Sequence, residues 1–249
     1  MRRGPILICV LLTGCASTKP DLHALYGNQA NATQQPPLVL VHGMFGSELV
    51  DSRDGDPIWP GRYDPRLVPR IDPDNLTADF DNLEATGLAP GAADIALNDS
   101  LLAIFENVAG YVRTEPGQQP SGRPYYVFMY DWRRDNLESV RQFAGFLDQI
   151  RHDHNDPNLR VDVVTHGLGG LIVRYFVRYG TVDELTDNEF PVTNAGGEYV
   201  RRVILLGVPN LGTIAAFRAV MVGFPGESGE IPAGAFLTWP SIYQLFPHP

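Results

Sequence analysis

Residues 161–171 read VDVVTHGLGGL, and this stretch decides the fold class. Its first four residues form a mainly apolar run, which is typical of a strand that is covered on both faces. A glycine-rich turn follows at Gly167, Gly169 and Gly170. The apolar spacing over 168–179 then indicates an amphipathic helix. The stretch therefore predicts a buried strand that enters a helix through a tight turn.

The rest of the chain repeats this alternation. Apolar runs of the kind that form buried strands occupy 38–41, 125–130 and 203–206. Helical patterns occupy 98–113 and 136–152. Strands that alternate with helices predict an α/β fold with a doubly wound parallel sheet. In such sheets the site lies beyond the carboxyl ends of the strands, so the loops that follow the apolar runs are expected to carry the chemistry.

The composition and charge of the chain argue against several classes of function. The 249 residues are 44% hydrophobic, which is enough for one globular domain with a proper core. They include 19 Lys and Arg against 29 Asp and Glu, a formal net charge of −10. No run of basic residues offers a surface to phosphates, so we expect no nucleic-acid partner. The only lysine, Lys19, excludes a Walker A loop, because that loop needs a Lys at its Gly-Lys-Ser/Thr end.

The first 15 residues, MRRGPILICVLLTGC, have the features of an export signal. Arg2 and Arg3 precede an apolar stretch that is too short to span a membrane, and a small-residue exit ends at Cys15. This exit resembles the bacterial lipobox, in which cleavage precedes a cysteine that carries acyl chains. We therefore expect a signal peptide over 1–14, and a lipidated Cys15 with a flexible tether over 15–37. The protein would then be an exported, membrane-anchored lipoprotein of the bacterial cell envelope, with a plain signal peptide as the alternative.

Four motifs follow the predicted strands in one order. They are His42-Gly43-Met44-Phe45, Tyr130-Asp131-Trp132-Arg133, Thr165-His166-Gly167-Leu168-Gly169 and Gly207-Val208-Pro209-Asn210. With them the chain resembles the lecithin:cholesterol acyltransferase (LCAT) family of α/β-hydrolases, over roughly residues 37–249. The resemblance implies a hydrolase core over 38–210 and the start of a lid, apparently truncated, over 211–249. It also implies a reaction that moves or hydrolyses fatty acyl esters of lipids, without cofactor or metal.

Each site residue is assigned by its match to the family pattern. His166 and Gly167 occupy the nucleophile elbow, the sharp turn between a strand and a helix. The resemblance implies that the backbone N–H groups of Met44 and Leu168 form the oxyanion hole, where they would stabilise the developing negative charge of an acyl transfer. It also implies that Trp59 lies in a lipid-facing segment, and a buried structural tryptophan is the alternative.

The nucleophile itself is missing from this pattern. The family carries Ser at the position of Gly167, and no other serine of the sequence lies in a Gly-x-Ser-x-Gly motif. Glycine has no atom that can attack a carbonyl, so covalent acyl-enzyme chemistry is excluded at this position. The family's Asp and His follow on later strands. After Gly207 we find only a helical pattern over 214–222 and a lid-like run, in which His248 is expected to be a surface residue.

Several interpretations therefore stay open. The chain is a catalytically dead lipid-binding member, a fragment of a longer enzyme, or an enzyme with an unrecognised nucleophile. A rival from another class is an interaction lipoprotein that uses the fold only as a scaffold. Lipid chemistry predicts an apolar groove between Met44, Leu168 and residues 214–249, whereas a fragment predicts an open sheet edge at 203–206. The oligomeric state is left open.

Other polar clusters are expected to be structural. Asp131 and Arg133 are predicted to form an ion pair that holds a strand-end loop, with the indole of Trp132 packed inside. The acidic loop over 51–56 lacks the glutamate that ends a calcium loop, and 152–154 lacks a third ligand at metal spacing. We therefore expect no metal site.

Overall fold

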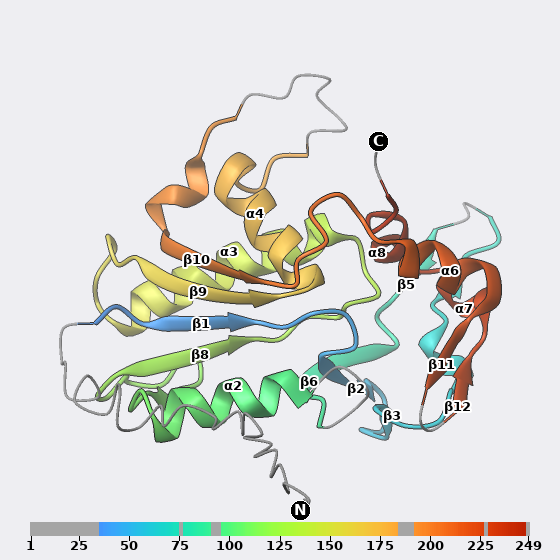
Figure 1. Ribbon diagram of the computed structural model, residues 1–249, viewed down its shortest axis with the longest axis horizontal. Coiled ribbons are helices and arrows are strands. Elements are labelled where there is room, and N and C mark those ends of the chain that lie inside the picture. Colours follow the sequence, from blue (N-terminus) through green and yellow to red (C-terminus); the bar gives the residue numbers. More distant parts are fainter. Residues whose placement is uncertain (1–34, 75–76, 91–95, 184–191, 227–228, 248–249) are drawn as a thin grey trace, which may run out of the picture.

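The computed structural model describes residues 35–74, 77–90, 96–183, 192–226 and 229–247 (Figure 1). Cys15, the signal peptide and most of the tether lie outside these ranges, as does His248. The predictions made for them are therefore not tested by the structure.

A five-stranded parallel sheet forms the centre of the molecule (Figure 1). The strand order is β10-β9-β1-β8-β7, and strand β1 lies in the middle with Val39 opposite Tyr126 on one side and Val163 on the other. The bounds are β1 Leu38–Val41, β7 Val112–Arg113, β8 Pro124–Phe128, β9 Val161–His166 and β10 Val200–Leu206. The apolar runs of β1, β8 and β9 are buried, as a sheet covered on both faces requires.

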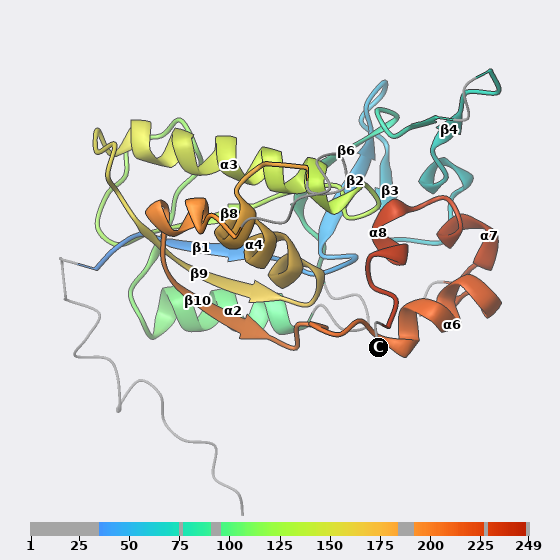
Figure 2. The same cartoon turned by 90° about the horizontal axis from the view of Figure 1, so that it is seen from above.

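Helices cover both faces of this sheet (Figure 2). Helix α2 (Ala96–Asn107) lies on one face, and α3 (Asn136–Asp153) and α4 (Leu168–Tyr179) lie on the other. Side chains of β1 alternate between the two layers, because successive residues of a strand point to opposite faces. Leu40 joins the core cluster that includes Phe105 of α2, whereas Val41 joins the cluster that includes Phe143 of α3 and Ile172 of α4. The predicted α/β class with a doubly wound parallel sheet is confirmed.

Element boundaries agree with the sequence-based predictions where the apolar pattern is long. Helix α4 and helix α6 (Ile214–Val222) begin and end at the predicted residues. The helix predicted over 98–113 was wrong at its end, because α2 stops at Asn107. The chain then turns at Gly110, which has a φ of 68°, and enters strand β7. No helix within the described ranges is both long and apolar enough to cross a membrane.

A small antiparallel sheet lies beyond the carboxyl edge of the central sheet (Figure 1). Its strands were not predicted from the sequence. Their order is β3-β2-β6, with bounds Pro57–Trp59, Ser47–Asp51 and Leu83–Leu88. A short hairpin of β4 (Arg70–Ile71) and β5 (Ala78–Asp79) accompanies it.

The segment predicted to start a lid packs against this small sheet and the loops around it. It contains α6 and four short elements: β11 Phe224–Gly226, β12 Gly229–Ile231, α7 Ala233–Phe236 and α8 Pro240–Tyr243. Trp239 is fully buried, its indole N–H donates to the carbonyl of Leu67 at 2.9 Å, and its ring meets that of Trp132 edge-on at 5.2 Å. Trp239 therefore ties the end of this segment to the core, whereas most apolar side chains of α6 stay exposed.

Candidate active site

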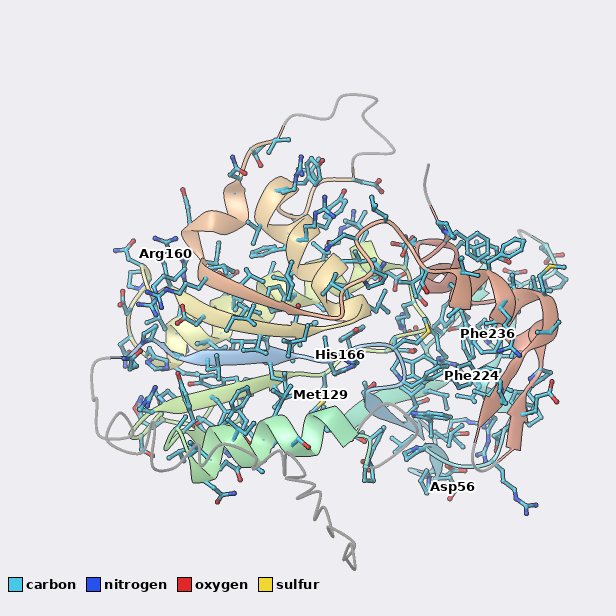
Figure 3. The ribbon with its side chains drawn as sticks, in the orientation of Figure 1. Asp56, Met129, Arg160, His166, Phe224 and Phe236 are labelled. Carbon is cyan, nitrogen blue, oxygen red and sulfur yellow. The ribbon has the colours of Figure 1, made fainter. Side chains whose placement is uncertain are left out.

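The loops after β1 and β9 touch at the carboxyl edge of the sheet, where Figure 3 marks His166. A Cβ atom placed on Gly43 would lie 3.0 Å from Nδ1 and 3.2 Å from the carbonyl oxygen of His166. These distances are tighter than most Cβ contacts, so any side chain at position 43 would push the two loops apart by a few tenths of an ångström. The structure thus brings together the two segments that carry Met44 and Leu168, the predicted oxyanion-hole residues.

Gly167 forms the turn between β9 and α4. Its φ is 51° and its ψ is −124°, a backbone conformation that is strained for residues with a side chain. Its N–H donates to the carbonyl of Leu206 at 3.0 Å, and its own carbonyl accepts from the N–H of Gly170 at 3.1 Å. The backbone has the sharp strand-to-helix geometry of a nucleophile elbow. No side-chain atom stands there to attack a substrate.

His42 is fully buried behind this contact. Its ring stacks on that of Tyr130 at 4.3 Å, and the Tyr130 hydroxyl donates to the carbonyl of His42 at 2.7 Å. The Nδ1 atom lies 2.8 Å from the carbonyl oxygen of Gly43, while Nε2 has no hydrogen-bond partner among the described residues. Burial lowers the pKa of His42 to about 4, and the nearby His166 adds to this lowering. The neutral ring and Tyr130 therefore position the loop after β1, a role for Tyr130 that sequence reasoning missed.

The ion pair predicted after β8 is present and buried. Arg133 donates from Nη2 to Asp131 at 2.7 Å and from Nε to the same carboxylate at 2.9 Å. Its Nη1 donates to the carbonyl of Leu67 at 3.1 Å. Between the two charges in sequence, Trp132 is fully buried and its indole N–H donates to the carbonyl of Ser47 at 3.3 Å. The pair holds the loop after β8 against the segment at Leu67, and Trp132 ties the same loop to Ser47 of β2, as a structural role requires.

Trp59 lies beneath the loop that carries Met44. Its side chain is only 8% exposed, and its indole N–H donates to the carbonyl of Phe45 at 2.9 Å. Its ring packs against Phe45 at 5.0 Å and against Trp132 at 5.8 Å. The structure describes Trp59 as a buried residue with its indole in protein contacts. That this segment faces lipid stays a prediction.

The acidic loop over 51–56 is held by arginines. Both oxygens of the buried Asp51 carboxylate accept hydrogen bonds from Arg53, and one accepts a further bond from Arg66 at 3.1 Å. The hydrogen bonds from Arg53 hold the pKa of Asp51 well below its usual range. Among the residues that the structure describes, no group of three metal-ligating side chains comes together.

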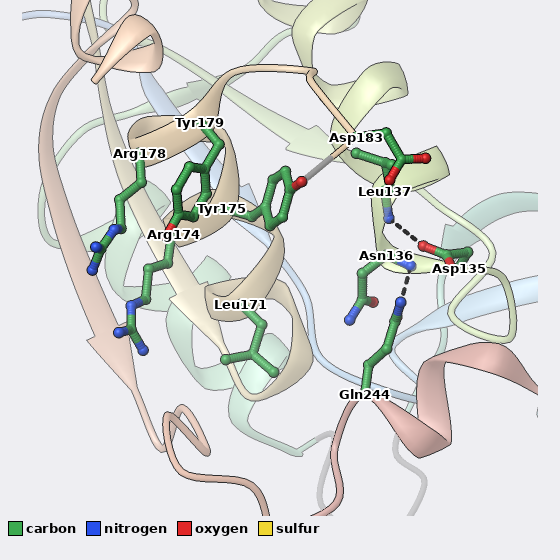
Figure 4. Close-up of a pocket in the computed structure, with 10 residues that line it drawn as sticks. All are labelled: Asp135, Asn136, Leu137, Leu171, Arg174, Tyr175, Arg178, Tyr179, Asp183 and Gln244. Carbon is green, nitrogen blue, oxygen red and sulfur yellow. Dashed lines mark hydrogen bonds between the residues drawn. The ribbon is translucent and has the colours of Figure 1, made fainter. Parts of the chain in front are cut away.

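A cavity of about 460 Å³ lies beside α4 (Figure 4). Four parts of the chain line it: the outer face of α4, Asp183 beyond the end of α4, the residues at the beginning of α3, and Gln244 directly after α8. The lining residues are Asp135, Asn136, Leu137, Leu171, Arg174, Tyr175, Arg178, Tyr179, Asp183 and Gln244. Neither Met44 nor Leu168 is among them, so this cavity is not the groove predicted between those residues and 214–249. Sequence reasoning missed the cavity, and the only signal for it was the repeat of Leu171, Tyr175 and Tyr179 along one helix face.

Comparisons with known proteins agree with the fold and the motifs. Residues 122–233 match the model of the family described as lecithin:cholesterol acyltransferase. The search of curated proteins found no match. Among solved structures the chain is similar to one titled "The crystal structure of Tle4-Tli4 complex", with a TM-score of 0.52 and 15% sequence identity. The alignment covers 86% of this chain and 55% of that one, so this chain spans about half the length of its structural neighbour. Residues 122–233 are thus similar to the lecithin:cholesterol acyltransferase family, and the core has an α/β fold with a five-stranded parallel sheet and helices on both faces.

Proposed function

We propose that this LCAT-like protein binds lipids that carry fatty acyl esters and does not turn them over through an acyl-enzyme. The observation that carries the proposal is Gly167 at the turn of the elbow. Its backbone has the φ and ψ of that turn, and the residue has no side-chain oxygen or sulfur atom. An ester carbonyl held there would meet donors without an attacking group.

The remaining parts of the site support binding of such an ester. The N–H groups of Met44 and Leu168 belong to loops that meet through the contact between Gly43 and His166. In serine hydrolases the oxyanion hole and substrate binding alone supply roughly 10³–10⁴-fold acceleration over water, far less than a working enzyme provides. The proposed site is therefore one that recognises the substrate class of the family and releases it unchanged.

We also propose that the protein is exported and held on a membrane through acyl chains on Cys15. This rests on the sequence of residues 1–15. Mass spectrometry of the membrane fraction tests it, and the expected N-terminal peptide begins with an acylated Cys15. An unmodified Cys15, or an intact Met1 on a protein found outside the membrane fraction, would contradict this proposal.

Two measurements on the full chain test the lack of turnover. Purified protein should hydrolyse p-nitrophenyl esters no faster than a vector control, and a fluorophosphonate probe should label no serine. Stoichiometric labelling of any serine would show that the nucleophile stands elsewhere. Binding is tested separately with a fluorescent acyl ester, for which we expect saturable binding. A folded protein that binds no acyl ester would favour the rival class, an interaction protein that uses the fold as a scaffold.

A further inference from the structure

The cavity beside α4 has the dimensions of a ligand-binding site. Its volume of about 460 Å³ falls within the range of pockets that hold small molecules. Leu171, Tyr175 and Tyr179 are spaced four residues apart on α4, so they form one apolar and aromatic row about 12 Å long. The cavity opens on the outer face of the elbow helix, away from the turn at Gly167.

Two arginines on the same helix give this cavity a concentrated positive charge. Arg174 and Arg178 are one helical turn apart, and Figure 4 shows their guanidinium groups extending to the same side of α4. Arg174 donates from Nη1 to the side chain of Asn210 at 3.0 Å, a neutral partner. The Nε atom of Arg178 is buried and has no hydrogen-bond partner among the described residues. Like charges one turn apart destabilise a helix unless an anion neutralises them.

The acidic side chains of the cavity lie at its other end and are engaged elsewhere. Asp135 caps α3 by accepting a hydrogen bond from the N–H of Leu137 at 2.7 Å. Asp183 lies 4.0 Å from the guanidinium of Arg141 on α3. Both acids are therefore engaged, Asp135 with a backbone N–H and Asp183 with Arg141. The cavity therefore separates a cationic end from an acidic end (Figure 4).

We infer that this cavity binds a phosphate ester. The phosphate would lie between Arg174 and Arg178, because planar guanidinium groups match phosphate oxygens with paired hydrogen bonds and two of them balance a dianion. The organic part of the ester would lie against Tyr175, Tyr179 and Leu171. This part would fill the volume of the cavity that a phosphate ion alone leaves empty. This site does not involve Gly167, so the result of its test does not depend on the function proposed above.

Calorimetric titration of the full chain tests the inference. Three probes separate the sources of the phosphate: inorganic phosphate, phenyl phosphate, and neutral phospholipid vesicles with and without phosphatidic acid. We expect phenyl phosphate to bind saturably and more tightly than inorganic phosphate, since only the former has a body for the aromatic row. Binding to vesicles only when phosphatidic acid is present would identify a lipid headgroup as the source. Binding of phenyl phosphate without vesicle binding would identify a soluble ester.

Variants assign the binding to this cavity. The double variant Arg174→Gln/Arg178→Gln should bind phenyl phosphate at least tenfold more weakly. The matched control Arg62→Gln/Arg218→Gln removes two exposed arginines elsewhere and should bind like the parent protein. If the double variant is unfolded by circular dichroism, the single variant Arg178→Gln replaces it, because it keeps the bond from Arg174 to Asn210. No saturable binding of any probe, or an equal loss in the control variant, would overturn the inference.

Discussion

At the residue scale, glycine at position 167 removes the nucleophile and also relieves the backbone strain of the turn. A side chain at this position must adopt a φ of 51°, which L-residues rarely do. Enzymes accept such strain because it presents the nucleophile to the substrate. With glycine the turn is retained without the strain, and the nucleophile is lost.

A serine at this position should fit the space and cost stability. A Cβ atom on Gly167 would lie 3.6 Å from the Cα atom of Gly43, an ordinary contact. We therefore expect Gly167→Ser to fold and to lose about 1 to 2 kcal/mol of unfolding free energy from backbone strain alone. Urea denaturation measures this. In the matched control Gly145→Ala, the added methyl group meets no atom within 4 Å, and α3 should gain about 0.5 to 1 kcal/mol.

Turnover by the same variant is a separate question. We expect Gly167→Ser to remain inactive on p-nitrophenyl esters, because a serine needs a base within about 3 Å to become a nucleophile. Measurable hydrolysis by this variant would show that a base of this chain reaches residue 167. A Gly167→Ser protein as stable as its parent would contradict the strain argument.

The buried ring of His42 predicts how stability changes with pH. The folded protein holds the pKa of His42 near 4, against an ordinary value of 6.5. At a pH between 4 and 6.5, His42 binds a proton in the unfolded chain and stays neutral in the folded protein. The free energy of unfolding should therefore fall by about 3 kcal/mol as the pH drops from 6.5 to 4, and this contribution is fully present above pH 6.5. Urea denaturation at a series of pH values measures it.

Two variants identify the residue behind this pH dependence. His42→Gln should make the slope smaller, whatever its effect on stability at neutral pH, and the remaining slope includes His154, whose pKa burial also lowers. His152→Gln replaces an exposed histidine and should leave the slope as it is. The depressed pKa of Asp51 does not interfere, because its effect appears only as the pH falls below about 3.8. An unchanged slope in His42→Gln would refute the assignment.

At the scale of elements, buried polar contacts fix the loops that follow strands β1 and β8. The loop after β8 carries a salt bridge whose Arg133 side chain is fully buried. Removing one partner of such a pair leaves a charge without compensation, which costs far more than the pair itself contributes. The loop after β1 is held differently, by the hydroxyl of Tyr130 on the carbonyl of His42.

Loss of the Asp131 carboxylate should therefore be costly. We expect Asp131→Asn to lower the free energy of unfolding by about 3 to 5 kcal/mol, because Arg133 stays buried without its partner. The control is Asp81→Asn, which breaks an ion pair with Arg134 of the same length, 2.7 Å, at a side chain that is 84% exposed. That change should cost less than about 1 kcal/mol. Equal effects of the two substitutions in urea denaturation would contradict the structural role of the buried pair.

The elements that could be predicted from the sequence are those with a long and regular apolar pattern. Strand β1 and helix α4 were placed correctly because every residue of the strand is buried and one face of the helix is apolar. Strands β2, β3 and β6 were missed because they are short and mix polar with apolar residues. Such strands depend on their partners more than on their own pattern.

The candidate site was predictable only in part, for a similar reason. The elbow is a local turn, so the motif around Gly167 placed it directly. The burial of Trp59 depends on Phe45 and Trp132, residues of two other loops, and no local pattern reports it. The cavity beside α4 is lined in part by Gln244 of the C-terminal segment, whose side chain accepts from the N–H of Asn136 at 2.9 Å. Contacts of this kind arise only from the complete fold.

At the scale of the whole molecule, one aromatic cluster joins the two sheets to the C-terminal segment. It contains all three tryptophans of the chain, with ring distances of 5.8 Å between Trp59 and Trp132 and 5.2 Å between Trp132 and Trp239. Phe236, marked in Figure 3, packs against Trp239 at 4.7 Å. The lid-like segment is thereby anchored through its aromatic side chains.

Stability should report this anchoring. We expect Trp239→Ala to lower the free energy of unfolding by about 3 to 5 kcal/mol, because it opens a cavity at the centre of the cluster. Leu237→Ala is the neighbouring control. Its side chain is 53% exposed and its removal should change stability by less than about 0.5 kcal/mol. A small effect of Trp239→Ala would mean that the C-terminal segment contributes little to the core.

The edge of the central sheet predicts how molecules of this protein meet one another. Among the described strands β10 is the outermost on its side, and its apolar side chains are exposed: 37% for Val203, 53% for Ile204 and 44% for Leu205. An exposed apolar edge strand offers unpaired backbone groups and a hydrophobic surface to another chain. We therefore expect self-association that rises with concentration in sedimentation velocity.

Ile204→Lys should shift the protein toward the monomer, since a charge on an edge strand opposes pairing. Ile71→Lys, at a strand residue of β4 that is 48% exposed, should leave the association unchanged. Equal sedimentation of Ile204→Lys and its parent over a tenfold dilution would exclude β10 as the contact surface.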